Sequence, residues 1–402
     1  MRRFLVLLPL AVAAPALAQE KAQDDAPAIV VTGTPLAETA RRLDSCLARH
    51  CAPKEDIAAA LAHAENQFIA GDYEGSRATL RAAHIRNQGN AGQYPVEVAN
   101  LDRAYGRLTN LNGYPERGRI LQINSLETLR DGLGADDARV LAQQLMTGDE
   151  YVQMGRVEAG DDVYRKVEKQ ARKAGLTPVM GMAMLRQATM FSAVSRVRQG
   201  YQQEAAARVA RLEATTEPAL AEYRAAARVL RARLAAQSGN GKGFTDAMAD
   251  LRGDRLTRPV LVYDTPIDAD TVSGATVARR APTLLAVDEN GGRSINAGPE
   301  WIDVQYRIAA NGTVSDVDVL RHSDHADDAW ANSVVKSVGK RRYAPLALAR
   351  GSEGMVRVER FSFVYDVASV TRSRIPRRAD AGRTTSLDLT LEPPPVVSSD
   401  RL

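Results

Sequence analysis

The sequence predicts a mainly α helical-hairpin solenoid, followed by a small α+β domain with the order strand, strand, helix, strand. Three observations support this. Residues 39–252 are rich in Ala, Leu, Arg and Glu and poor in strand formers, as helices are. Residues 301–367 contain apolar and polar residues in alternation, which is typical of strands. Prolines and glycines recur between 253 and 299, and we interpret residues 253–280 as a linker.

The first 18 residues have the pattern of a secretory signal peptide. Arg2 and Arg3 precede an apolar run from Phe4 to Leu17, and small residues precede the expected cleavage before Gln19. The run is short for a membrane span, so we expect cleavage and export. The alternative is an uncleaved signal that anchors the chain in the inner membrane.

The charge and the cysteine content limit the kinds of partner and site that we expect. The formal net charge of +4 falls to +2 without the two leader arginines, and charges of both signs are interspersed, so nucleic acid is not an expected partner. The two cysteines, Cys46 and Cys51, can form a disulfide in an oxidising compartment if a helix ends between them; otherwise they are free thiols. His50 nearby would still leave a metal site one ligand short.

Three segments of residues 39–252 resemble degenerate tetratricopeptide repeats, and a fourth offers another helix pair. In the first, Gly71-Asp72-Tyr73 makes the turn between two helices. Each hairpin cannot cover its own apolar face, so neighbours stack into a solenoid, and the resemblance implies a protein-interaction scaffold. Extra turns are expected within residues 87–131. The four segments are Ile57–His84, Leu141–Gly175, Met184–Leu212 and Pro218–Met248.

The α+β part begins with a predicted hairpin. Residues 302–308 alternate, with Asp303 on the face expected to be wet. Asn311 and Gly312 tolerate the positive φ of a tight turn, so the chain should return through residues 314–320, where a shift in the apolar phase suggests a bulge. A helix then begins, with Ser323 or Asp324 as its N-cap.

This order of elements, with these residues, resembles the C-terminal domain of TonB proteins over residues 281–368. The resemblance implies a periplasmic module of the Gram-negative cell envelope that binds extended receptor segments by strand addition. Expected partners are outer-membrane TonB-dependent receptors or peptidoglycan-associated proteins. The matching segments are Ala310-Asn311-Gly312, residues 314–321, Arg342-Tyr343-Ala344-Pro345-Leu346 and Val356–Tyr365.

The last predicted strand, Met355–Val367, is the candidate binding edge. Main-chain hydrogen bonds would supply affinity there, and pockets for alternate side chains would choose the peptide. The candidate residues are Met355, Arg357, Glu359, Phe361, Phe363 and Tyr365.

Residues 19–38 are expected to be flexible, apart from a β-prone run at residues 28–33. This run resembles the TonB box that such domains bind, so self-association through Ile29, Val30 and Val31 is a further hypothesis; the simpler interpretation is a sticky tail. Residues 369–402 are polar and end in a Pro-rich stretch, and we expect disorder.

No catalytic site, cofactor or metal is predicted. His322 and His325 are the nearest to a metal-ligand cluster, but helix capping by their neighbours is the simpler explanation. Residues 239–243 lack the spacing of a phosphate loop. A basic strip at residues 336–342 is expected to be a solvated helix end, or else to meet an anionic surface.

The sequence thus predicts a non-catalytic periplasmic binding protein. An alternative is an energy transducer that couples an inner-membrane proton motor to TonB-dependent receptors in siderophore or vitamin transport. The solenoid stands where such a protein would need a long Pro-rich spacer. A third candidate is a metal-dependent hydrolase using His322 and His325.

Overall fold

The computed structural model describes residues 34–198, 200–253, 256–265, 267, 286–287, 293–294, 299–324, 326–349, 351–369 and 376–390. The predicted signal peptide, the β-prone run at residues 28–33 and His325 lie outside the described residues. Within them, no helix combines the length and the apolar character needed to span a membrane.

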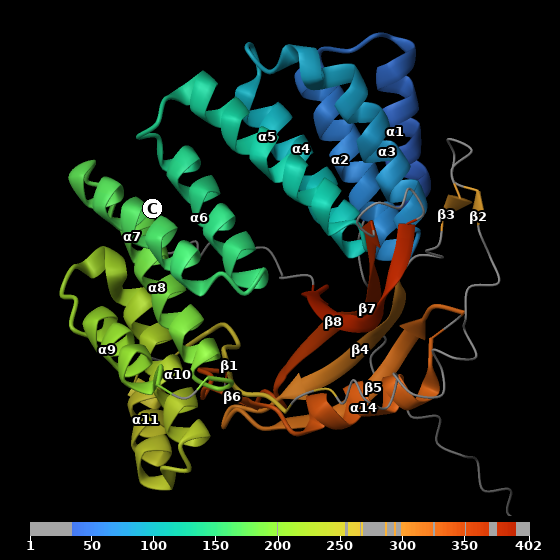
Figure 1. Cartoon of the computed structure of the whole chain (residues 1–402). Coiled ribbons are helices and arrows are strands. Elements are labelled where there is room, and N and C mark those ends of the chain that lie inside the picture. Colours follow the sequence, from blue (N-terminus) through green and yellow to red (C-terminus); the bar gives the residue numbers. More distant parts are fainter. Residues whose placement is uncertain are drawn as a thin grey trace, which may run out of the picture. The chain divides into compact units, whose positions relative to one another are not determined.

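Helices occupy the chain from Leu36 to Gly253, and each packs against the next (Figure 1). This succession of helical hairpins is the predicted solenoid. The helices are α1 (Leu36–Ala48), α2 (Pro53–Ala70), α3 (Tyr73–Asn87), α4 (Pro95–Leu111), α5 (Pro115–Leu133), α6 (Ala138–Gln153), α7 (Val157–Lys173), α8 (Thr177–Val194), α9 (Gln202–Glu213), α10 (Ala221–Gln237) and α11 (Gly241–Gly253), with short 3-10 turns η1 (Gln88–Asn90) and η2 (Pro218–Leu220).

Local residues explain where the helices begin and end. Proline stands in the first turn of α2, α4, α5 and α8, where its missing N–H costs nothing. Gly71 ends α2 with a φ of 90°, a left-handed conformation that favours glycine. The prolines within residues 87–131 therefore start helices, and that segment supplies the hairpin of α4 and α5.

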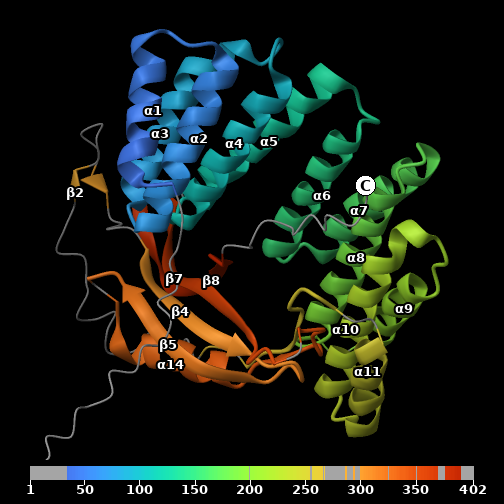
Figure 2. The ribbon, with the colours of Figure 1, turned by 180° about the vertical axis from the view of Figure 1, so that it is seen from behind.

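A four-stranded antiparallel sheet follows, with the order β5-β4-β7-β8 (Figure 2). Its strands are β4 (Glu300–Ile308), β5 (Val314–His322), β7 (Met355–Ser369) and β8 (Pro376–Asp388). Helix α14 (Asp328–Gly339) lies on one face, where Trp330, Val334 and Val338 are fully buried. Among the described residues there are also two short strand pairs: β1 (Leu261–Tyr263) with β6 (Arg342–Tyr343), and β2 (Ala286–Val287) with β3 (Arg293–Ser294).

Local contacts determine the turn between β4 and β5 and the residue at which α14 begins. Gly312 has a φ of 82°, and a Cβ there would lie 1.9 Å from the carbonyl oxygen of Tyr343, so only glycine fits. The helix begins later than expected: Asp327 is the N-cap and accepts a bond from the Trp330 amide. Ser323 instead accepts a bond from the Trp301 amide, which ties β4 to the end of β5.

Two sequence predictions about this part are wrong. Asp303 is not on a wet face but fully buried, because the end of α2 covers it. Residues 376–388 of the predicted disordered tail form β8, whose main stabilisation is its ladder with β7.

Candidate peptide-binding site

The predicted binding edge at Met355–Tyr365 is covered on both sides from Val358 to Phe363. β7 pairs with β4 along Glu300–Ile308 on one side. On the other side it pairs with β8 from Glu359 onward, and Leu389 and Thr390 extend the contact to Val358. The prediction of an edge strand is wrong because the polar tail contributes a further strand.

The side chains of the six candidate residues serve the domain itself. Phe361, Phe363 and Tyr365 are buried in the core beneath α14, and Met355 packs against the same core. The Phe363 ring centroid lies 5.8 Å from that of Trp330. Arg357 forms an ion pair with Asp388 of β8. These residues hold β7 inside the sheet.

The sixth candidate, Glu359, belongs to a buried polar cluster. Its Oε2 accepts bonds from the Arg341 guanidinium at 2.6 Å and from the Tyr306 hydroxyl at 3.1 Å, and that hydroxyl lies 2.8 Å from the Tyr343 hydroxyl. Burial and the nearby carboxylate of Glu359 raise the pKa of Tyr306, so it stays a neutral donor. Arg341 is 4% exposed, so it is not part of a solvated basic strip.

The edge that remains is β5. In the part of the chain that the structure describes, this nine-residue strand pairs only with β4. Val319 and Leu320 are among its exposed apolar residues. Near its start, Asp316 has a φ of 50° and accepts a bond from Arg307, and the pairing register with β4 shifts nearby. The register shifts a second time between Val319 and Arg321, so irregularities interrupt the edge at two points.

A buried arginine network fixes the middle of the sheet. Arg360 and Asp303 stand opposite each other on β7 and β4, both fully buried. Arg360 Nε donates to Asp303 Oδ1 at 2.6 Å and its Nη2 to Oδ2 at 2.9 Å. Arg321 of β5 adds a third bond, to Oδ2 at 2.9 Å. Bidentate geometry of this kind offsets the desolvation of both charges.

The same arginine joins the sheet to the solenoid. Arg360 Nη1 and Nη2 donate to the carbonyl oxygens of Phe68 and Ile69 at the end of α2, at 2.6 and 2.9 Å. Its guanidinium carbon lies 4.0 Å from the Trp301 ring centroid. Burial alone would lower the pKa of Arg360, but its bonds to Asp303 and its other partners raise it, so the charge persists.

Two further contacts join the sheet to the helices. The hydroxyls of Tyr73 and Ser362 are 3.0 Å apart, and Arg383 of β8 donates to the carbonyl oxygen of Asn110 at 2.8 Å. The pairing of β4 with β7 is thus held from several helices. In the described sheet, β5 and β8 are the two strands that stand at an outer edge along their whole length.

The remaining candidates are placed as follows. Cys46 and Cys51 form a disulfide, with α1 ending at Ala48 between them and a Cα–Cα distance of 5.1 Å. His322 is exposed, and its Nδ1 lies 3.0 Å from the carbonyl oxygen of Ser323. Among the described residues, no group of three or more His, Cys, Asp or Glu side chains is placed to hold a metal ion.

Comparisons with known proteins give low similarity. No family model and no curated protein matches the chain. Among solved structures, it is similar to BtubC (BKLC) from P. vanneervenii, with 13% identity, coverage of 55% of this chain and 89% of that one, and a TM-score of 0.43. It is also similar to two structures of kinesin-light-chain TPR-like repeats from Podosopora anserina. Both are 15% identical and match 50% of this chain, with 95% and 96% of theirs covered and TM-scores of 0.40 and 0.39.

Proposed function

We propose that this chain is a non-catalytic periplasmic binding protein. Its helical solenoid acts as a protein-interaction scaffold, and its C-terminal sheet accepts an extended peptide as an added strand. The observation that carries the proposal is the β5 edge, which pairs on one side only among the described strands and exposes Val319 and Leu320. Such an edge offers a row of donors and acceptors to another strand.

Two other features support the finer parts of the proposal. The order β4, β5, α14, β7 matches the order on which the resemblance to the TonB C-terminal domain rests. The disulfide of Cys46 with Cys51 suits an oxidising compartment. The proposed partners are therefore TonB-dependent outer-membrane receptors or peptidoglycan-associated proteins, and the place of binding moves from β7 to β5.

Hydrogen exchange on the full chain tests strand addition. The probe is a synthetic peptide with the sequence of residues 25–36, which contains the box-like run, and the control is the same composition scrambled. Added main-chain bonds should slow exchange within Val314–His322. If a saturating peptide leaves exchange in β5 unchanged, binding at this edge is refuted.

A matched pair of variants separates the two sheet edges. Leu320 on β5 and Leu387 on β8 are 47% and 46% exposed, so the same substitution perturbs similar environments. Leu320→Lys should weaken peptide binding severalfold, because an edge lysine disfavours strand pairing. Leu387→Lys should leave the affinity unchanged. Weakening by Leu387→Lys alone would place the peptide on β8 and contradict the proposal.

A further inference from the structure

The β5 strand, which is proposed to accept a peptide, has little packing of its own. None of its nine described residues is buried. Two register shifts divide its ladder with β4 into three stretches of two residue pairs each. If such a strand had to be ordered while a peptide pairs with it, the ordering would reduce the affinity. Contacts that fix the strand in advance therefore favour binding at its edge.

Arg321 fixes the last stretch of the strand. Its Nε donates to Asp303 Oδ2 at 2.9 Å, and its Nη2 donates to the carbonyl oxygen of Ile69 at 3.1 Å. The side chain thus joins the end of β5 to the end of α2. It is still 47% exposed. A strand added beside β5 would cover part of it, and hydrogen bonds gain strength where water is excluded.

Trp301 makes a second link between β5 and α2. Ser323, directly after β5, donates its amide to the carbonyl oxygen of Trp301 at 2.9 Å, and its Oγ accepts a bond from the Trp301 amide at 3.1 Å. The Trp301 ring packs in the core of the first helices. A Cβ at Gly71 would lie 2.4 Å from Cζ2 of this ring. The backbone of Trp301 therefore holds the end of β5, while its ring lies against the end of α2.

The end of α2 is suited to hold both links. The last carbonyl groups of a helix lack partners within it, and the negative end of the helix dipole attracts cations. The carbonyl oxygens of Phe68 and Ile69 accept bonds from Arg360, and Arg321 adds a second bond to Ile69. Arginines from two strands of the sheet thus cap one helix end.

We propose that the end of α2 positions β5 for strand addition, with Arg321 and Trp301 as the positioning residues. Peptide binding at β5 and the contact of the sheet with α2 then strengthen each other, because both order the same stretch of strand. The inference rests on the proposed function and adds its regulation. A partner of the solenoid that displaces the end of α2 would lower the affinity of the β5 edge.

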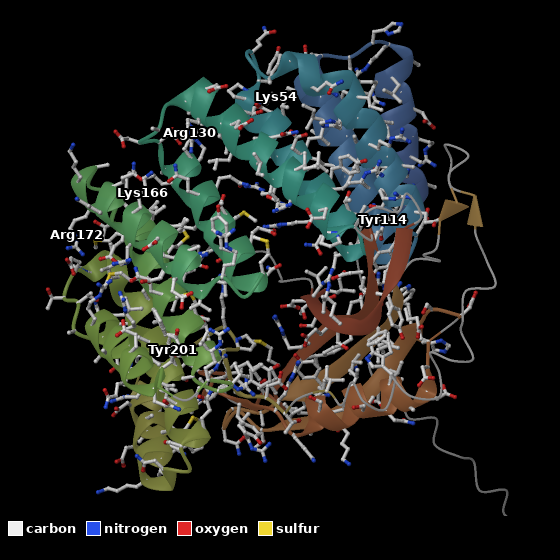
Figure 3. The ribbon with its side chains drawn as sticks, viewed as in Figure 1. Lys54, Tyr114, Arg130, Lys166, Arg172 and Tyr201 are labelled. Carbon is white, nitrogen blue, oxygen red and sulfur yellow. A yellow bond between two sulfur atoms is a disulfide. The ribbon has the colours of Figure 1, made fainter. Side chains whose placement is uncertain are left out.

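A pair of glycine variants tests the contact from the solenoid side. Gly71→Ala places a Cβ against the Trp301 ring and leaves β5 untouched. Gly134→Ala is the matched control: Gly134 ends α5 with a φ of 86°, close to the 90° of Gly71, and a Cβ there meets nothing within 4 Å. Figure 3 labels Tyr114 and Arg130 at the two ends of α5, and the amide of Gly134 donates to the carbonyl oxygen of Arg130.

Fluorescence anisotropy of a labelled peptide with the sequence of residues 25–36 measures the affinity of each full-length variant. Gly71→Ala should weaken binding at least about fivefold, which is the lower end of common couplings between two sites. Gly134→Ala should leave the affinity unchanged. Circular dichroism checks that both variants keep their helices. Equal effects of the two variants, or unchanged affinity in Gly71→Ala, would overturn the inference.

Hydrogen exchange tests the same coupling in the other direction and needs no variant. A saturating amount of the peptide should slow exchange of the Gly71 and Asp72 amides, which bond to carbonyl oxygens of α2, as well as exchange within β5. The amide of Gly134 should exchange at an unchanged rate. A contact with only a structural role would leave exchange at the end of α2 indifferent to the peptide, and that result would contradict the proposal.

Arg321→Met separates positioning from stability. It removes an exposed partner of Asp303, so the urea midpoint should change little, whereas peptide affinity should fall severalfold. Unchanged affinity would remove Arg321 from the positioning role.

The outcomes also separate this inference from the proposed function. If the peptide protects β5 while the end of α2 does not respond and Gly71→Ala binds normally, only the coupling fails. If the peptide neither binds nor protects β5, the proposed site fails, and the coupling fails with it.

Discussion

Arg360→Met should weaken the contact between the sheet and the solenoid. Methionine fills similar volume but cannot donate, so Asp303 loses its bidentate partner and the carbonyl oxygen of Phe68 loses its donor. The carbonyl oxygen of Ile69 keeps a bond from Arg321 Nη2 at 3.1 Å. Arg321 remains as a partner of Asp303, and its side chain is 47% exposed. The buried carboxylate of Asp303 therefore keeps one ion-pair partner.

The expected loss in the free energy of unfolding follows from this arrangement. Breaking a buried ion pair by removing one partner costs about 3–5 kcal/mol, and the retained Arg321 contact places this case near the lower end, at about 3 kcal/mol. With a denaturant slope of about 2 kcal/mol per molar urea, the unfolding midpoint of the sheet should fall by about 1.5 M. Arg321→Met is the matched control, because it removes the exposed partner of the same carboxylate and should cost no more than about 1 kcal/mol.

The chain provides its own reporter for the assay. Trp330 of α14 lies in the core of the sheet domain, and Trp301 of β4 packs in the core of the first helices. Tryptophan fluorescence therefore follows the sheet and its contact with the solenoid. Far-ultraviolet circular dichroism follows mainly the helices of the solenoid. In Arg360→Met the fluorescence transition should move to lower urea than the dichroism transition. Equal shifts in the Arg360→Met and Arg321→Met variants would refute the assignment of a dominant role to Arg360.

Three further predictions concern other parts of the chain. Gly118→Ala should destabilise the α4–α5 pair by about 1–3 kcal/mol in urea unfolding, because its Cβ meets backbone, whereas Gly92→Ala meets nothing within 4 Å and should be nearly neutral. Burial raises the pKa of Asp56, but its bonds from Arg86 and a neighbouring asparagine lower it overall. Its stabilising contribution is thus present above about pH 4 and lost as pH falls through the lower folded-state pKa, so wild type and Asp56→Asn should converge in stability under acid; a constant difference would contradict this. Deleting residues 370–402 removes β8 and should speed hydrogen exchange in the second half of β7, where unchanged exchange would argue against the β7–β8 ladder.

Local signals predicted much of this fold. The helical hairpins follow from composition and from turn residues such as Gly71, whose left-handed φ can be inferred from sequence. The hairpin between β4 and β5 follows from Asn311-Gly312 for the same reason. These features depend on neighbours in sequence, so a single chain reveals them.

Features set by distant partners could not be predicted in this way. β8 has almost no apolar pattern, and only its pairing with β7 makes it a strand, so composition alone indicated disorder. The alternation of apolar and polar residues places Asp303 on the face expected to be exposed to solvent. Only the guanidinium groups of Arg360, 57 residues away, and of Arg321 make its burial favourable. A charged residue at the centre of each of two predicted strands was the one available signal.

The β7–β8 ladder has a mechanical consequence. The two strands are antiparallel, with Ser369 opposite Pro376 at the linked end and Glu359 opposite Asp388 at the other. Tension applied to the chain after Asp388 acts on the hydrogen bonds of the β7–β8 ladder one after another, starting from that end. Bonds that break in sequence require less force than bonds that must break together. The pairing of β4 with β7, held by Arg360, would stay intact meanwhile. The C-terminal strand is therefore a detachable element, which can be pulled off a sheet that does not itself unfold and laid down again when the load is released.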